Sequence, residues 1–184
     1  MTEFARKRLV AILRVLLVFQ TGIVITGAIV RLTGSGLGCP TWPECSGDSF
    51  TPVHEQIEGF NAWIEFGNRL LTFALLLACV LSILAVLFSR RKDLRLLVLG
   101  QLAGIFGQAI LGGITVLTGL NPWTVAGHFI LSIILIAGAQ SLLTKAKVPY
   151  ERKHLGKNTL HAISRVHVLL TFIVIIAGTI VTGS

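Results

Sequence analysis

Apolar stretches of about 20 residues recur along the chain, and they constrain its fold more than any other feature. A continuous apolar stretch of this length matches the hydrocarbon thickness of a bilayer and is typical of a membrane span. Charged residues make up only 13% of the chain, whereas a soluble domain carries roughly 25%. So few charges leave too little polar surface for a water-soluble globule. The sequence therefore predicts a polytopic membrane protein.

Helices and closed barrels are the two structures that satisfy every backbone polar group in lipid. The apolar stretches are long and continuous, and they lack the alternation that a barrel strand needs. We therefore expect an all-α bundle of five transmembrane helices. They are placed near residues 9–30, 66–88, 96–119, 124–143 and 163–182. Residues 32–63 are expected to form one large loop, and residues 144–162 a basic linker.

The basic residues are distributed unevenly between the two ends of these spans. All 16 Lys and Arg residues except Arg31 and Arg69 fall on one side of the alternating topology. Because basic loops remain in the cytoplasm, we expect a multi-pass protein of the cell membrane with a cytoplasmic N-terminus and an extracytoplasmic loop 32–63. The net charge of +8 comes from these basic residues at one end of the spans. We therefore expect membrane lipid, and no nucleic acid, as a partner.

The first and last apolar stretches resemble each other when the chain is shifted by 151 residues. Arg14 and Gly27 then align with Arg165 and Gly178, among matching apolar residues. Repeated halves are a common way of building a membrane bundle around a central site. We therefore expect residues 1–143 to form a four-helix half and residues 163–184 to be the first helix of a second half. On this interpretation the 184 residues are part of an eight-span protein.

Two cysteines, Cys39 and Cys45, lie close together in loop 32–63. Their spacing leaves three states open. An oxidising outer side would favour a disulfide, and two free thiols are the second possibility. A metal site is the third, with His54 as the only nearby histidine. The remaining cysteine, Cys79, lies within an apolar stretch, where cysteine behaves as a small packing residue.

Glu65, Asn68 and Arg69 stand at the expected start of the second span. Residues three and four positions apart share one face of a helix, so both neighbours can reach Glu65. A carboxylate at this depth is costly unless it faces a partner or the bundle interior. Two interpretations follow. Glu65 and Arg69 form an interfacial salt bridge, or Glu65 is an acid, a base or a charge stabiliser beside a buried ligand.

His128 lies in the fourth expected span, near its outer end. Intramembrane histidines generally indicate ligand or proton-relay roles, and imidazole is a common axial ligand of heme iron. A hydrogen bond to another helix is the alternative role, and the same two interpretations apply to Gln108 in the third span. Glu65 and His128 are expected at similar depth on the same side. This placement favours one shared site.

Together these segments resemble the heme A synthase family of cytochrome oxidase assembly proteins. The resemblance is carried by the run GAIVRLTGSGLGCP over residues 27–40, the following Trp42-Pro43-Glu44-Cys45, Glu65, residues 108–116 and His128. It implies two four-helix halves and an oxidoreductase that converts the C8 methyl of heme O into a formyl group, which gives heme A for cytochrome oxidase. It further implies a heme b cofactor in one half and the substrate heme O in the other, the N-terminal one.

The resemblance also implies roles for individual residues. Glu65 becomes the catalytic carboxylate beside the reacting heme and His128 an axial ligand of its iron, with Asn68, Arg69 and Gln108 around the bound heme. The two loop cysteines, Cys39 and Cys45, become a disulfide. The family commonly has histidine three residues after the glutamate, where this chain has Asn68. Either His128 alone ligates the iron in this half, or a different ligand replaces the missing histidine.

The implied partner that delivers heme O is a heme O synthase, and the oligomeric state, a homo-oligomer included, is left open. Two other functions compete with the synthase. A b-type electron-transfer protein usually needs paired histidines on facing helices, and Asn68 weakens that interpretation. A transporter half usually has Gly- or Pro-broken helices at its site, which these spans lack. We favour the synthase, and we expect this chain alone to be an incomplete enzyme.

Overall fold

The computed structural model describes residues 3–47, 49–53, 56–147 and 159–183. Within these ranges the chain forms five helices: α1 (Glu3–Leu32), α2 (Phe60–Phe88), α3 (Lys92–Leu117), α4 (Pro122–Lys147) and α5 (Thr159–Gly183). Helices α1 to α4 are long and apolar enough to cross a membrane, and α5 contributes a shorter apolar segment, Ala162–Gly178. The expected all-α membrane bundle is confirmed. His54 and most of the expected linker lie outside the described residues.

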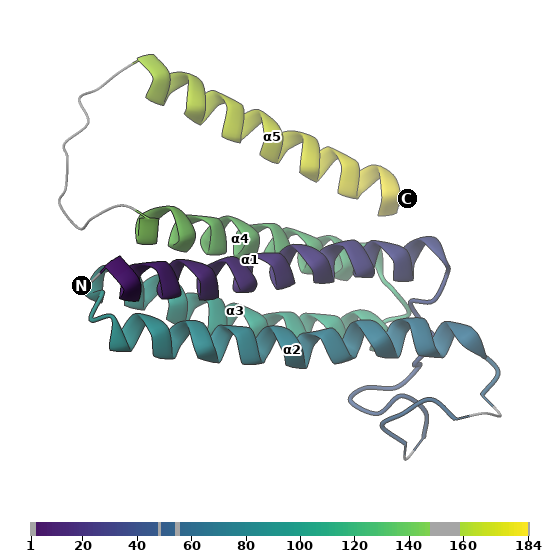
Figure 1. The fold of residues 1–184 in the computed structure, drawn as a ribbon. Coiled ribbons are helices and arrows are strands. Elements are labelled where there is room, and N and C mark those ends of the chain that lie inside the picture. Colours follow the sequence, from purple (N-terminus) through teal and green to yellow (C-terminus); the bar gives the residue numbers. More distant parts are fainter. Residues whose placement is uncertain (1–2, 48, 54–55, 148–158, 184) are drawn as a thin grey trace.

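Helices α1 to α4 form an antiparallel four-helix bundle (Figure 1). Each helix contacts two neighbours in the order α1, α2, α3, α4 and back to α1. Within the described residues, the backbones of the two diagonal pairs, α1 with α3 and α2 with α4, do not approach each other closely. Helix α5 lies outside this bundle, where it contacts α4.

The helices extend past the apolar stretches that predict them. Helix α2 begins at Phe60 and not near residue 66, so Glu65 lies in its second turn. Helix α4 continues to Lys147, so Lys145 and Lys147 stand in its last turn and not in a linker. The apolar pattern marks the lipid core, whereas the helix continues through the interface. Basic side chains in a last turn also interact favourably with the helix dipole.

Two glycines end helices at the same end of the bundle. After α1, Gly34 has a φ of 67°, the Ser35 N–H donates to the Val30 carbonyl, and the Gly34 N–H donates to the Arg31 carbonyl. After α3, Gly119 repeats this arrangement with a φ of 62°. This is the Schellman motif, in which a glycine adopts the left-handed conformation without steric cost. The first motif ends α1 before the long loop, and the second ends α3 before the tight turn that leads to α4.

The bundle interior is apolar towards the N-terminal end of α1 and crossed by a polar bridge further along. Its buried apolar residues include Leu9, Leu13, Leu16, Leu75, Val86, Leu94, Val98 and Leu142. On α1, Gln20 is 2% exposed, and its Nε2 donates to Oε1 of Gln101 on α3 at 2.9 Å. Gln101 in turn donates to the Leu135 carbonyl on α4 at 3.0 Å. This bridge joins the diagonal pair α1 and α3.

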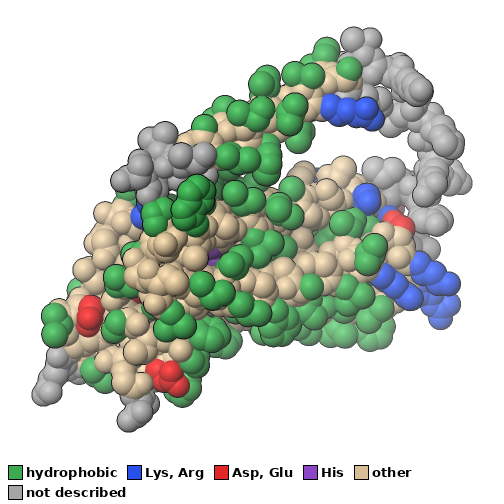
Figure 2. Space-filling model, turned by 180° about the vertical axis from the view of Figure 1, so that it is seen from behind, with side chains coloured by type: hydrophobic (Ala, Val, Ile, Leu, Met, Phe, Trp, Pro, Cys, Tyr) green, Lys and Arg blue, Asp and Glu red, His purple; other side chains and the backbone are tan. Residues whose placement is uncertain are grey.

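Charged side chains gather at the two ends of the molecule, and apolar side chains cover the surface between them (Figure 2). Lys and Arg are concentrated at the end that holds the N-terminus, where Arg6 donates to the Lys147 carbonyl and Arg91 to the Lys145 carbonyl. Most acidic side chains in this view lie at the opposite end, near the loop before α2. This segregation is the one expected for a bundle that spans a bilayer.

The loop before α2 packs closely against the bundle at two glycines. A Cβ on Gly38 would lie 2.5 Å from the Asn61 carbonyl oxygen and 2.8 Å from the Ala62 nitrogen at the start of α2. The Trp42 ring covers Gly113 of α3, where an added Cβ would lie 2.7 Å from the ring. These contacts hold the loop against both α2 and α3.

We expect Gly38→Ala to lower the free energy of unfolding by about 1–3 kcal/mol, because the new methyl meets backbone atoms that cannot turn away. The measurement is the thermal unfolding midpoint of the protein in detergent micelles. Gly100→Ala is the matched control, since an added Cβ there meets nothing within 4 Å. A midpoint of Gly38→Ala equal to that of the control would contradict the close docking of the loop.

Candidate functional site

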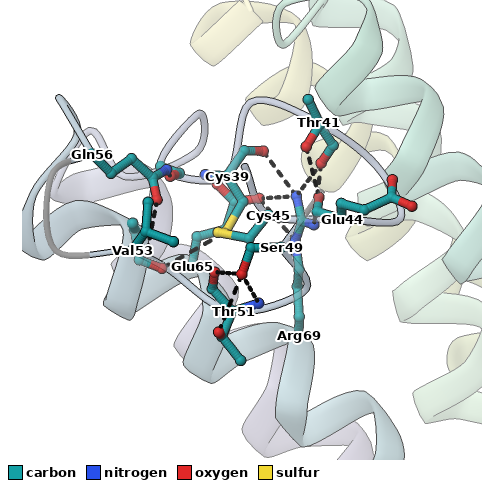
Figure 3. Close-up of a disulfide and its surroundings, with 12 residues drawn as sticks. Cys39, Thr41, Glu44, Cys45, Ser49, Thr51, Val53, Gln56, Glu65 and Arg69 are labelled. Atoms are coloured by element: carbon teal, nitrogen blue, oxygen red, sulfur yellow. Dashed lines mark hydrogen bonds and ion pairs between the residues drawn. A yellow bond between two sulfur atoms is a disulfide. The ribbon is translucent and has the colours of Figure 1, made fainter. Parts of the chain in front are cut away.

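Glu65, which is buried, and Arg69, which is partly buried, form an ion pair on α2, one helical turn apart. Oε1 of Glu65 lies 2.7 Å from Nη2 and 3.1 Å from Nε of Arg69. The other carboxylate oxygen, Oε2, accepts the N–H of Cys39 at 2.9 Å (Figure 3). Glu65 is 6% exposed. Two N–H groups of the guanidinium converge on Oε1, so Oε2 is left to accept the Cys39 N–H, and bonds between charged groups of this kind are among the stronger hydrogen bonds.

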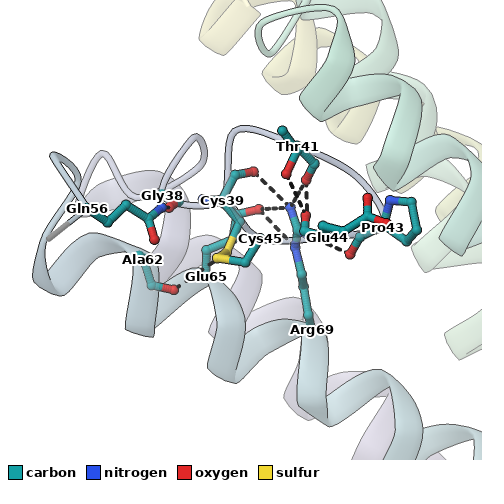
Figure 4. Close-up of polar contacts among 10 residues, drawn as sticks. All are labelled: Gly38, Cys39, Thr41, Pro43, Glu44, Cys45, Gln56, Ala62, Glu65 and Arg69. Atoms are coloured by element: carbon teal, nitrogen blue, oxygen red, sulfur yellow. Dashed lines mark hydrogen bonds and ion pairs between the residues drawn. A yellow bond between two sulfur atoms is a disulfide. The ribbon is translucent and has the colours of Figure 1, made fainter. Parts of the chain in front are cut away.

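The Arg69 guanidinium also organises the loop around the cysteines. It donates to the carbonyls of Cys39 at 2.9 Å, Thr41 at 3.2 Å, Pro43 at 3.4 Å and Glu44 at 3.1 Å (Figure 4). A guanidinium suits this role because its donors are fixed in one plane, whereas an ammonium is a point charge. One side chain of α2 therefore holds the loop carbonyls and the Glu65 carboxylate together.

The cysteines Cys39 and Cys45 are joined in a disulfide, and both are fully buried. Of the three states that the spacing left open, the structure has the disulfide. The described residues also contain no group of three or more His, Cys, Asp or Glu side chains suited to a metal ion. A side-chain contact fixes the loop just before the disulfide, since Gln56 donates to the Gly38 carbonyl at 2.6 Å. Cys79 is free and buried, as expected of a packing residue.

Asn68 lies on the side of α2 that faces α1. Its Oδ1 accepts the hydroxyl of Thr26 at 2.6 Å, and Gly27 lies beside its amide nitrogen. Asn68 therefore makes an interhelical contact. It shares a helix with Glu65 and Arg69, but no described hydrogen bond joins it to them.

His128 and Gln108 meet where α3 and α4 pack. The Gln108 amide donates to the His128 carbonyl at 3.1 Å and to the Ser132 hydroxyl at 2.6 Å. The His128 ring covers Gly112, with Cε1 3.3 Å from the place of an added Cβ. Its Nδ1 is buried and has no hydrogen-bond partner among the described residues. The imidazole thus has a buried ring nitrogen that no described group satisfies.

The site residues therefore form two clusters in the same half of the bundle. One consists of Glu65, Arg69 and the disulfide loop, and the other of Gln108, His128 and Ser132. Glu65 and His128 stand on the diagonal helices α2 and α4, and no described hydrogen bond or ion pair joins the two clusters. Trp42 connects the loop to α3, because its ring covers Gly113, the residue that follows Gly112. A carboxylate and an imidazole on opposite sides of a bundle can flank a ligand that enters between them.

Sequence reasoning missed Trp42 as a contact, Thr26, Ser132 and the Gln20–Gln101 bridge. Trp42 was included only as part of a motif. Gln101 and Gln108 are seven residues apart in an apolar helix, so they share a face. That repeat of a polar residue was the available signal for a polar stripe inside the bundle. Nothing in the sequence indicates which hydroxyl meets Asn68 or Gln108, since that depends on how the helices are rotated.

Fold and site together define a multi-pass helical membrane protein with a disulfide-closed loop docked on an ion pair. The family model of the cytochrome oxidase assembly protein matches residues 10–184. The chain therefore belongs to the cytochrome oxidase assembly protein family.

Proteins described as heme A synthase are among its relatives. The heme A synthase of Shewanella oneidensis is 32% identical over 142 residues, which cover 68% of this chain and 42% of the relative. The heme A synthase of Bacillus pumilus is 33% identical over 132 residues, which cover 70% of this chain and 41% of the relative. The heme A synthase of Geobacillus thermodenitrificans is 27% identical over 117 residues, which cover 61% of this chain and 35% of the relative. The chain thus spans about two fifths of their length. No solved structure matches it.

The disulfide predicts the reactivity of the 3 cysteines. We expect the protein, denatured without a reductant, to take up one maleimide, because Cys79 alone is free. After reduction it should take up three. Intact mass spectrometry counts the additions directly. Three additions without reductant would contradict the disulfide, and a Cys79→Ser variant should reduce each count by one.

The ion pair predicts the effect of removing Arg69. We expect Arg69→Met to lower the free energy of unfolding by about 3–5 kcal/mol, because Glu65 is left as an uncompensated buried charge. The double variant Arg69→Met, Glu65→Gln should recover part of that loss, since no charge remains. Chemical denaturation in detergent measures both. If the double variant lost the sum of the two single losses, the pair would not be coupled.

Proposed function

We propose that this chain contributes the substrate-binding half of a heme A synthase, a membrane oxidoreductase that oxidises the C8 methyl of heme O to a formyl group. The family membership supports the assignment, as do relatives described as heme A synthases. The observation that carries it is Glu65, a carboxylate held beside the disulfide loop by Arg69 and by the Cys39 N–H.

Glu65 is proposed to act at the reacting methyl. Conversion of a methyl into a formyl group takes one water and releases four electrons and four protons, so a proton acceptor at the carbon is required. Glu65 supplies the carboxylate, and Arg69 together with the Cys39 N–H keeps it in one orientation. Preorganised groups of this kind cost no rearrangement during the reaction. The docked loop covers the same place, because Gly38 and Trp42 pack against α2 and α3.

His128 is proposed to hold the substrate through its iron. Imidazole is a common axial ligand of heme, and the His128 ring has a buried nitrogen without a described partner. These residues fit one axial ligand in this half, since Asn68 is engaged with Thr26. A heme b cofactor, which would receive the electrons, is proposed for the second half. Heme O synthase is the proposed donor of the substrate.

The proposed organisation follows the same logic. Residues 1–143 would form the first half, residues 144–162 a cytoplasmic linker and residues 163–184 the first helix of the second half. The closed ring of α1 to α4 supports this division, as does the position of α5 outside it. We also propose that the N-terminus is cytoplasmic and that loop 32–63 faces outward, because the basic residues gather at the end of the N-terminus.

An electron-transfer protein with no chemistry of its own is the weaker candidate. Such a protein usually ligates heme by paired histidines from facing helices. Helices α1 to α4 contain His128 as their only histidine. This bundle therefore lacks the second ligand that the b-type interpretation requires.

We expect Glu65→Gln to reduce heme A formation at least about 100-fold, because a positioned proton acceptor contributes at least that much, while heme O binding persists. The test uses the polypeptide as its gene encodes it, in cells that make heme O and lack another heme A synthase. Extracted hemes are separated by chromatography. Glu58→Gln is the control, since its carboxylate is outside the Arg69 cluster. Normal heme A output from Glu65→Gln would remove Glu65 from the reaction.

A further inference from the structure

The carboxamide of Gln108 has a fixed orientation that leaves its oxygen free. Its Nε2 donates to the His128 carbonyl and to the Ser132 hydroxyl. A carbonyl accepts hydrogen bonds only, so the nitrogen must face His128 and the amide cannot be turned over. The opposite atom, Oε1, is buried and has no partner among the described residues.

A second glutamine on the same face of α3 provides the comparison. Gln101 lies two turns earlier, and both ends of its amide are used. Its Oε1 accepts from Gln20 and its Nε2 donates to the Leu135 carbonyl. A buried acceptor without a donor costs about 1–3 kcal/mol, and native proteins leave few of them. Gln108 thus differs from Gln101 in that its Oε1 has no described hydrogen-bond donor.

The free oxygen belongs to the cluster of the proposed iron ligand. Gly112 follows Gln108 by one helical turn, and the His128 ring covers Gly112. Gln108 is also linked directly to His128, because its side-chain amide donates a hydrogen bond to the His128 backbone carbonyl. Gln108 would therefore adjoin a heme held by the His128 imidazole.

We propose that Oε1 of Gln108 accepts a hydrogen bond from the side-chain hydroxyl of heme O, which makes Gln108 a specificity-determining residue. This inference rests on the function proposed above. Heme O carries a hydroxyethylfarnesyl group where protoheme carries a vinyl group, so only heme O offers a hydroxyl donor at that position. The heme propionates are acceptors at neutral pH and do not satisfy Oε1. A site built around a substrate hydroxyl discriminates strongly against the analogue that lacks it, because a buried polar group is then left unpaired.

The test compares heme O and protoheme binding to wild type, Gln108→Met and Gln101→Met, using the 184-residue chain in detergent. Soret absorbance follows each titration. Methionine keeps the length of glutamine and removes the acceptor. We expect Gln108→Met to weaken heme O binding about tenfold or more and to leave protoheme binding unchanged. The farnesyl tail favours heme O in every variant, so its contribution cancels when the ratio of the two affinities is compared between a variant and wild type.

Gln101→Met controls for lost stability, because it leaves Gln20 unpaired but does not touch the His128 cluster. Its ratio of affinities should equal that of wild type. Equal weakening of both hemes in Gln108→Met, or no weakening, would overturn the specificity role while the heme site stands. If wild type binds neither heme, and His128→Ala does not differ from it, the proposed heme site itself fails and the inference with it.

Discussion

The Arg69 guanidinium is the interaction on which the outer half of the structure depends. It pairs with the Glu65 carboxylate and at the same time donates hydrogen bonds to carbonyl groups of the loop before α2. Burying one of these charges alone is strongly unfavourable, so the pair and the loop exist together or not at all. The disulfide shortens the free loop and brings Cys39 to the carboxylate. The result is a rigid polar end on an otherwise apolar bundle.

The spans, the helical class and the Glu65–Arg69 contact were predictable because they depend on local rules. Apolar length gives a span, and a four-residue spacing gives a shared helical face. The cysteine spacing alone left three states open, and the structure selected the disulfide. The contact between Asn68 and Thr26 was not predictable. It depends on how α1 and α2 rotate against each other, and a nearly uniform apolar surface does not encode that rotation.

The two halves of the candidate site also illustrate what a sequence leaves out. Similar depth along the membrane favoured one shared site for Glu65 and His128, and depth follows from position in the span. Which helices lie next to each other around the bundle does not follow from depth. The structure places the two residues on diagonal helices, each held by its own partners, Arg69 for one and Gln108 for the other. A ligand between them would be the only direct link across the bundle at this level.

The Gln20–Gln101 bridge has a consequence for where such a ligand can lie. It ties α1 to α3 across the bundle axis through two buried amides. Gly112, under the His128 ring, stands 11 residues beyond Gln101, about 16 Å along the helix at the usual rise. The bridge therefore separates the largely apolar N-terminal part of the bundle from the part that holds the candidate site residues. A ligand held by His128 would have to lie between this bridge and the docked loop, because Gln20 and Gln101 already bond to each other across the axis.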